Sequence, residues 1–164
     1  MNEETRPMKT VAESRTEQVQ ILLPEHINGY DRLFGGQLLE WIDVVAAIVA
    51  RRHSGKNVTT AAIDSLQFKG PAYANDTVLL TGTLTHVGTT SMEVCVKTYV
   101  ESLDGTHRLI NTAYIVMVAL DENEHPTRVP RLIPITREER EEWEAGERRQ
   151  ELRRQRRKDK RHLY

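Results

Sequence analysis

Hydrophobic and polar residues alternate along four stretches between residues 58 and 120, as in a β-strand that buries one face. The alternation is clearest from Ser91 to Ser102, where the even positions up to Val100 are apolar or threonine and the odd positions include charges. The set expected to face inward is Met92, Val94, Val96, Thr98 and Val100, opposite Glu93, Lys97 and Glu101. The other predicted strands are Arg15–Leu23, Val58–Lys69, Thr77–Val87 and Arg108–Leu120.

From Gly35 to about Arg52 the alternation of hydrophobic and polar residues stops. The segment has good helix formers, no proline, and apolar residues on nearly every face after Leu38. Such a helix is about 25 Å long, enough to run through the middle of a small domain. A helix that is apolar on all sides is expected to be buried on all sides.

The order of a strand, a helix and then four strands predicts an α+β fold with one long antiparallel sheet curled against one central helix. Asp104-Gly105 between the third and fourth of these strands is a hairpin signal. One sheet covers only part of a helix that is apolar on all sides. We therefore expect a second copy of the chain to cover the rest.

The two ends of the chain differ from this central part in composition. Residues 1–13 are polar and are predicted to be a flexible N-terminus, and residues 14–125 form the domain itself. Residues 126–164 begin with a proline-broken linker and continue as a charged, basic helix.

The C-terminal helix is predicted from Thr136 to about Lys160, and Thr136 followed by Glu139 is a capping-box signature. Its large apolar residues before the end are Trp143 and Leu152. With so few apolar anchors, we expect this helix either to dock lightly or to stand in solvent.

The composition narrows the class of protein. A chain of 164 residues with 38% hydrophobic and 29% charged residues is neither wholly disordered nor membrane-spanning. The single Cys95 cannot form an internal disulfide, and the N-terminus lacks an apolar targeting segment, so we expect a cytoplasmic protein. The histidines and the cysteine show no zinc-site spacing. We therefore expect no metal and no organic cofactor.

Asp43 is the most informative residue, because it lies among apolar neighbours in the middle of the predicted central helix. An ionised carboxylate buried without partners costs several kcal/mol, so it must be hydrogen-bonded, protonated or facing a cleft. Each of these suits a general base, and each also suits a structural aspartate. The residues alone leave both interpretations open.

Gly35 and Gly36 stand at the start of the same helix. Two glycines there leave backbone N–H groups uncovered, with the positive end of the helix dipole behind them. This arrangement suits a carbonyl oxygen that becomes negative during acyl transfer, although the glycines could instead serve only close packing of the helix on the sheet.

Three further residues are weaker candidates. His53 is expected to be a solvent-exposed cap at the end of the helix, and Cys95 an inert thiol. Asp64 could line a cleft or pair with a neighbouring strand.

The chain resembles the hot-dog-fold acyl-CoA thioesterases, also called acyl-CoA hydrolases, in three segments that occur in this order: HINGYDRLFGGQLLEWIDVVAAIVARRHSG, VTTAAIDSLQF and VGTTSMEV. The similarity runs from about Ser14 to Leu120. It implies a curved antiparallel sheet around a central helix, protomers paired edge to edge, and homo-oligomers that are often hexamers built as trimers of dimers.

The resemblance also implies roles for particular residues. Asp43 would be the general base toward water, or a nucleophile, and Asn28 of the other protomer would position the water or the thioester. The amides near Gly35 and Gly36 would hold the oxyanion. The coenzyme A of the substrate would lie along Ala61, Ala62, Ile63, Thr90, Ser91 and Met92.

An acyl-CoA thioesterase, releasing a free acid and CoA, is therefore the leading hypothesis for function. A hot-dog dehydratase or hydratase is the alternative enzyme, although such enzymes resemble a different pattern with a catalytic histidine. A binding module for nucleic acid or an anionic surface is the alternative from another class, and neither nucleic acid nor membrane is expected as a partner.

The charge distribution bears on these alternatives. The net charge of −1 divides into −8 over residues 1–147 and +7 from Arg148 to Tyr164. Arginine-rich helices bind phosphate backbones, but this one has no interleaved aromatic residues. The tail could instead bring Arg148, Arg149 or Arg153 to the phosphates of CoA, and Arg149 is our candidate.

Overall fold

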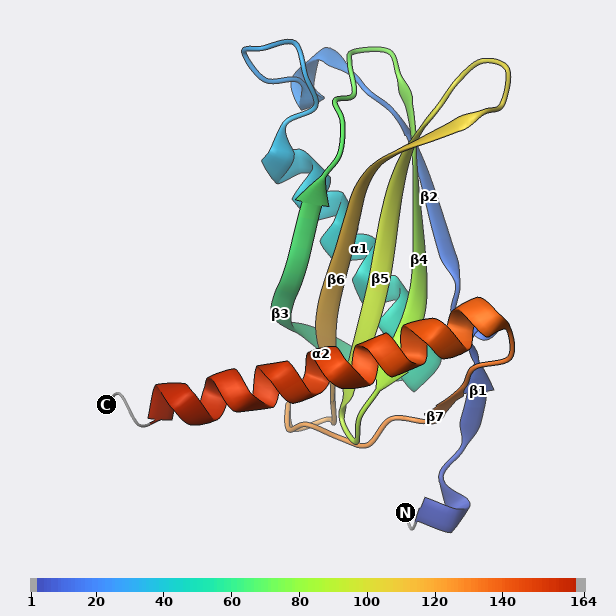
Figure 1. The fold of residues 1–164 in the computed structure, drawn as a ribbon, viewed down its shortest axis with the longest axis vertical. Coiled ribbons are helices and arrows are strands. Elements are labelled where there is room, and N and C mark those ends of the chain that lie inside the picture. The colour runs from blue at the N-terminus through green and yellow to red at the C-terminus, as the bar shows by residue number, and fades with distance from the viewer. Residues whose placement is uncertain (1–2, 162–164) are drawn as a thin grey trace.

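The computed structural model describes residues 3–161, and its centre is a five-stranded antiparallel sheet with the strand order β2, β4, β5, β6, β3 (Figure 1). Strands β4, β5 and β6 follow one another along the chain through short turns, as turn residues between alternating segments predict. The strands are β2 (Thr16–Ile21), β3 (Asn57–Phe68), β4 (Thr77–Val87), β5 (Ser91–Glu101) and β6 (His107–Leu120). The predicted α+β class is confirmed, and each predicted strand agrees to within two residues at either end.

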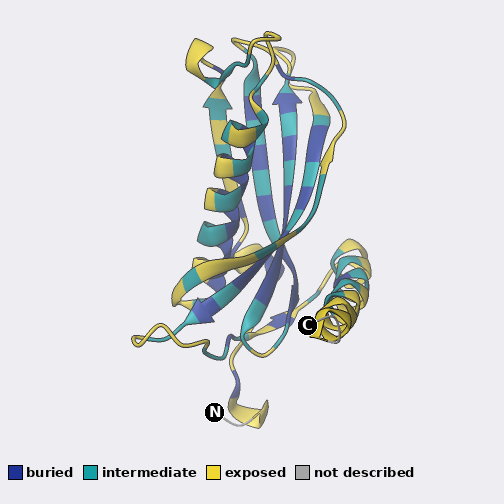
Figure 2. Ribbon diagram, turned by 90° about the vertical axis from the view of Figure 1, so that its left-hand side faces the viewer, coloured by how far each residue is buried: buried dark blue, intermediate teal, exposed yellow. Residues whose placement is uncertain are grey.

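Helix α1 (Gly35–Ser54) packs against one face of this sheet and contacts all five strands. Its sheet-facing residues are fully buried: Ile42, Val45, Ala46, Val49 and Ala50. The opposite side of the helix is open, as the yellow bands along α1 in Figure 2 show, and Val44 is 45% exposed. One sheet thus covers only one side of α1, as expected from the sequence, and within a single chain the other side of this apolar helix stays open.

Helix α2 (Arg137–Arg161) crosses the other face of the sheet near one end and extends beyond its edge (Figure 1). The predicted capping box is present, since Thr136 N–H donates to Glu139 Oε2 and Glu139 N–H donates to Thr136 Oγ1, each at 3.1 Å. Under α2 lies Glu93 of β5, whose side chain is only 1% exposed. On the face of β5 opposite the inward set, Glu93 and Cys95 are thus buried, while Lys97 and Glu101 stay partly exposed.

Few apolar side chains hold α2 against the sheet. The ring of Trp143 lies 4.3 Å from the ring of His86 on β4. Gly146 is buried against the same histidine, where a Cβ atom would come within 2.6 Å of His86 Cβ. Leu152 is 51% exposed and does not serve as an anchor. Of the two alternatives expected from the sequence, the structure shows a lightly docked helix rather than a free one: Gly146 is the one buried residue among the described residues of α2, and contacts at this glycine and buried charges replace the missing apolar anchors.

The N-terminal segment is held by residues from the other end of the chain. Strand β1 (Met8–Thr10) pairs in parallel with β7 (Arg131–Ile133), and the guanidinium of Arg6 donates to the carbonyls of Val129 and Gly88. Both strands lie in regions that sequence patterning assigned to a flexible terminus and a linker. A three-residue strand is too short to show an alternation of polar and apolar residues, and the paired residues of β1 and β7 lie more than 120 positions apart in the sequence.

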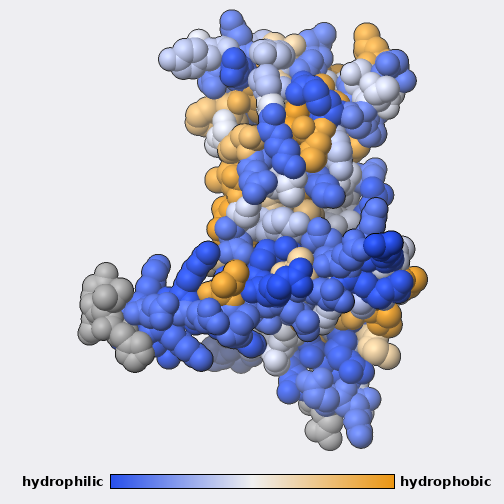
Figure 3. Space-filling model, in the orientation of Figure 1, coloured by the Kyte–Doolittle hydropathy of each residue, from blue (hydrophilic) through white to orange (hydrophobic). Residues whose placement is uncertain are grey.

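Large apolar side chains remain exposed beside α1 and the edge strand β3. Phe34, Ile63 and Phe68 are 56%, 44% and 57% exposed. Strand β3 lies at one end of the strand order, so its outer edge carries no neighbour among the described residues. In Figure 3, α2 is almost wholly hydrophilic while apolar side chains show above it and at the side of the molecule. A partner surface is expected to cover such a region.

Candidate active site

Asp43 and Thr60 meet where α1 passes β3. The hydroxyl of Thr60 donates a hydrogen bond of 2.7 Å to Oδ1 of Asp43, and it also lies 3.5 Å from Met117 Sδ. The aspartate is half-buried, with exposed Val44 beside it. A carboxylate held at one oxygen leaves the other oxygen free to accept a proton from a third group. Sequence reasoning did not single out Thr60, because nothing local marks which threonine of β3 faces the helix.

Two irregularities interrupt the pairing of β3 with β6 next to this threonine. The register shifts between Thr60 and Ala62 and again between Ile63 and Ser65. Each shift leaves one residue of β3 unpaired, Ala61 in the first case and Asp64 in the second. β-Bulges re-aim side chains, and here they direct Asp64 to the face that carries α2. There Asp64 accepts a 2.8 Å contact from Arg153.

Asn28 lies in the loop that precedes α1. Its side-chain oxygen accepts the N–H groups of Tyr30 and Arg32 at 2.9 and 3.2 Å, which closes the loop on itself. The residue lines a cavity of about 320 Å³ whose other walls are mainly apolar. These walls include Leu33, Leu38, Phe68, Pro71, Ala72 and Ile110. Among the described residues, Asp43 is not part of that lining, so one protomer does not bring Asn28 and Asp43 into one cavity.

Gly35 and Gly36 form the first turn of α1, as predicted. The first backbone hydrogen bond of the helix joins Leu38 N–H to Phe34 O, so the preceding N–H groups have no acceptor within the helix. Asp43 follows eight residues after Gly35, which is about 12 Å along a helix. The helix start and the carboxylate are therefore too far apart to act on one atom within the same protomer.

A second cavity, of about 260 Å³, lies between α2 and the turn from β4 to β5. It joins three of the residues predicted to bind CoA, Ala61, Thr90 and Ser91, to residues of α2. The α2 residues are Gln150, Arg153, Arg154 and Arg157. Of the other candidates, Ala62 and Ile63 do not line this cavity, and the side chain of Met92 is fully buried in the core.

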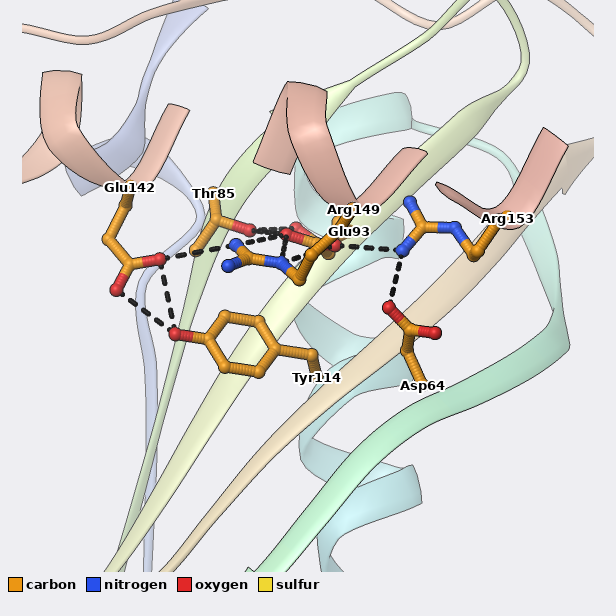
Figure 4. A network of polar contacts seen from close by, with 7 residues as sticks. All are labelled: Asp64, Thr85, Glu93, Tyr114, Glu142, Arg149 and Arg153. Atoms are coloured by element: carbon orange, nitrogen blue, oxygen red, sulfur yellow. Dashed lines mark hydrogen bonds and ion pairs between the residues drawn. The ribbon is translucent and has the colours of Figure 1, made fainter. Parts of the chain in front are cut away.

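Arg149, the arginine selected from the sequence, points elsewhere. Its guanidinium binds Glu93 through two nitrogens, at 2.7 Å for the shortest contact, and lies 4.0 Å from the centre of the Tyr114 ring (Figure 4). Arg153 also reaches Glu93, at 3.1 Å, and Thr85 donates to the same carboxylate at 2.7 Å. Burial opposes ionisation of Glu93, but the hydrogen bonds from Arg149 and Thr85 outweigh it and hold its pKa below the usual value.

The weaker candidates Cys95 and His53 lie in surroundings that indicate structural roles. Burial raises the pKa of Cys95 to about 11, which agrees with the expectation of an inert thiol. His53 is fully buried, and its Nε2 lies 2.8 Å from the carbonyl oxygen of Pro130. The expectation of a solvent-exposed cap is wrong, because the segment before β7 covers the end of α1.

No group of metal-binding side chains is found among residues 3–161. Within the same residues, neither α1 nor α2 is long and apolar enough to cross a membrane.

A five-stranded antiparallel sheet packed against one long helix is the architecture of the hot-dog fold. The family model described as "Thioesterase superfamily" matches residues 30–104. The chain is 40% identical over 137 residues to an uncharacterized acyl-CoA thioester hydrolase of Bacillus subtilis, YkhA, covering 83% of this chain and 80% of that one. The chain therefore belongs to the hot-dog acyl-CoA thioester hydrolases.

Solved structures agree with this assignment. Acyl-CoA hydrolase from Staphylococcus aureus, determined in complex with butyryl coenzyme A and coenzyme A, is 32% identical with a TM-score of 0.90, covering 96% of each chain. Structures of that enzyme also include alanine mutants of an aspartate, an asparagine and a threonine. A hexameric acyl-CoA thioesterase is 39% identical with a TM-score of 0.88, covering 92% of this chain and 97% of that one.

Proposed function

We propose that this chain hydrolyses acyl-CoA to a free carboxylic acid and CoA, with Asp43 as the general base. The observation that carries the proposal is the Asp43–Thr60 hydrogen bond on the central helix of a chain from this family. Asp43 takes a proton from water as the water oxygen attacks the thioester carbonyl. The C–S bond of the tetrahedral intermediate then breaks, and the proton held by Asp43 passes to the sulfur, so that CoA leaves as its thiol. Direct attack by the Asp43 carboxylate is the alternative route.

The site is completed by a second protomer. Asn28 and Asp43 do not share a cavity within one chain, and the exposed Val44, Ile63 and Phe68 mark an apolar surface beside Asp43 and along β3. A copy that pairs along the edge of β3 would bring its own Asn28 toward Asp43. The hexameric relative supports a further assembly of such dimers into a trimer of dimers.

The start of α1 supplies the electrostatic part of the mechanism. The uncovered N–H groups of Gly35 and Gly36 can donate to the oxygen that becomes negative in the tetrahedral intermediate. In the proposed dimer these amides come from the protomer that provides Asn28, because the asparagine loop leads directly into that helix.

The nucleotide end of CoA is assigned to the cavity between α2 and the β4–β5 turn. Thr90 and Ser91 present polar groups there, and α2 adds cationic side chains that suit phosphates. Arg154 and Arg157 replace Arg149 as the proposed phosphate contacts, because Arg149 is already bound to Glu93. No metal or organic cofactor takes part in this proposal.

Replacement of Asp43 by Ala tests the catalytic assignment. Thiol release from acyl-CoA should fall by at least about 10²-fold, the range typical of a lost general base, while the oligomer measured by light scattering stays intact. Turnover close to that of the wild type would contradict the role of Asp43. A panel of acyl-CoAs of increasing chain length would then identify the preferred substrate.

The same preparation separates the alternative functions. A dehydratase or hydratase would hydrate an enoyl-CoA without releasing a thiol, so parallel assays of hydration and thiol release distinguish it from a thioesterase. A gel shift that is sensitive to salt and lost on truncation after Glu147 would favour a nucleic-acid binder.

A further inference from the structure

The carboxylate of Glu93 is the centre of the contacts that hold α2 on the sheet. Its two oxygens receive hydrogen bonds from Thr85 on β4 and from Arg149 and Arg153 on α2 (Figure 4). The side chain is 1% exposed, so these charges interact where water does not screen them. A bidentate arginine contact also restricts direction, which a single apolar contact does not.

Each of the two arginines also has a second acidic partner, and these two partners lie at opposite ends of the network. Arg149 lies 3.3 Å from Glu142, and Arg153 lies 2.8 Å from Asp64 on β3. The network therefore links α2 to β3, β4 and β5 at once. Buried ion pairs add little net stability in general, but they can specify one arrangement among several, and such specificity is the role inferred here.

Two glycines bring α2 close to the sheet on either side of these contacts. At Gly146 an added Cβ would lie 3.2 Å from Glu93 Oε1, and at Gly88 an added Cβ would lie 2.8 Å from the side-chain nitrogen of Gln150. Gln150 thereby rests on the β4–β5 turn, close to Ser91. The position of α2 along the sheet is thus set at the same place where the second cavity opens.

The arginines that line the cavity differ in their availability. Arg153 is committed to Glu93 and Asp64, and its side chain is only 11% exposed. Arg157 is exposed and has no ion-pair partner among residues 3–161, while the 3.9 Å contact of Arg154 with Glu151 lies at the surface. Arg154 and Arg157 therefore keep their charge available for an anion.

We propose that Glu93 is a positioning residue, whose buried carboxylate sets α2 so that Arg154 and Arg157 face the nucleotide phosphates of CoA. The inference rests on the proposed function, because the anion is that of the acyl-CoA substrate. Glu93 itself touches neither the thioester nor the nucleotide. Its loss should therefore weaken binding of the nucleotide and leave the chemistry at Asp43 unchanged.

The test compares the full-length wild type with Glu93→Gln on two substrates. One is an acyl-CoA, and the other is the same acyl group on N-acetylcysteamine, which keeps the thioester but lacks the nucleotide. Glutamine preserves the shape of the side chain, and both arginines retain an acidic partner in Glu142 and Asp64. KM for acyl-CoA should rise about tenfold with kcat within about twofold, and KM for the short thioester should not change.

An unchanged KM for acyl-CoA, or an equal rise for both substrates, would overturn the inference. Glu141→Gln is the matched control, because it removes the same charge from an exposed pair with Arg137 on α2 and should change neither KM. If Glu93→Gln does not fold, Thr85→Val is used for the same comparison of KM values, since it removes one hydrogen-bond donor to Glu93 without changing any charge. It should raise KM for acyl-CoA alone, by about twofold to fivefold.

Calorimetric titration with CoA itself separates this inference from the proposed activity. A CoA affinity about tenfold weaker in Glu93→Gln supports the inference even if the wild type hydrolyses no thioester, in which case only the proposed function fails. Equal CoA affinity in the two proteins rejects the inference even if thioester hydrolysis is efficient.

Discussion

The hydroxyl of Thr60 on β3 donates a 2.7 Å hydrogen bond to the carboxylate of Asp43 on α1, and so joins the central helix to the edge strand at the proposed base. The contact selects which carboxylate oxygen is occupied and which remains for water. It also makes the position of the base depend on the bulged part of β3.

Thr60→Val should lower kcat by about 10-fold to 100-fold, because it leaves Asp43 without the donor that orients it. Thr60→Ser keeps the hydroxyl and should recover most of the activity. Steady-state thiol release measures both variants. Equal activity of Thr60→Val and the wild type would show that orientation of Asp43 does not depend on this contact.

The double variant Arg154→Gln, Arg157→Gln should raise KM for acyl-CoA by about threefold to tenfold, because it removes the available cations from the second cavity. The effect should shrink as salt rises, since both side chains are exposed and screened. Arg137→Gln with Arg148→Gln removes two charges from α2 outside the cavity and serves as the control. A rise in KM of the same size in the control would point to general electrostatic attraction.

Gly146→Ala should destabilise the protein by about 1–3 kcal/mol, although alanine is the better helix former by about 1 kcal/mol. The added Cβ would come within 2.6 Å of His86 Cβ and 3.2 Å of Glu93 Oε1. Urea unfolding followed by circular dichroism measures the change. A variant that is more stable than the wild type would mean that α2 is not seated as closely as described.

Stability should fall as pH decreases through about 6.5, the ordinary pKa of histidine. Burial lowers the pKa of His53, although a hydrogen bond with Pro130 opposes this, and burial likewise lowers the pKa of His86. The folded state then holds neutral histidines where the unfolded chain binds protons. Each such histidine removes up to about 1.4 kcal/mol of unfolding free energy per pH unit between the two pKa values.

His53→Gln tests this at one position. Nδ1 of His53 has no hydrogen-bond partner among the described residues, so a proton added there would be unsatisfied. The variant should show a shallower loss of stability between about pH 7.5 and 5.5 than the wild type. Loss of the ionised, stabilised form of Glu93 belongs to a lower pH range, below the usual pKa of a glutamate. Parallel curves for the two proteins would contradict the assignment to His53.

Much of the fold could be predicted because its information is local. Strands β4 and β5 alternate with period two, and α1 has helix formers without proline, so their limits follow from neighbouring residues. Asp43 was also recognisable, since a carboxylate among apolar helix residues needs a partner wherever the helix lies. The pairing of β1 with β7 was not recognisable, because it joins three residues near one end to three near the other.

The sequence by itself determined the order of strands and helices, the segment that forms the helix packed against the sheet, and the position of the unusual carboxylate in that helix. Only the tertiary structure decided what each side chain meets: Thr60 at Asp43, Arg149 at Glu93 rather than in the second cavity, and α2 over a strand face that is polar in sequence. Periodicity reports the conformation of neighbouring residues. Partners of buried charges come from elements far apart in the chain, and only the packing of those elements brings them together.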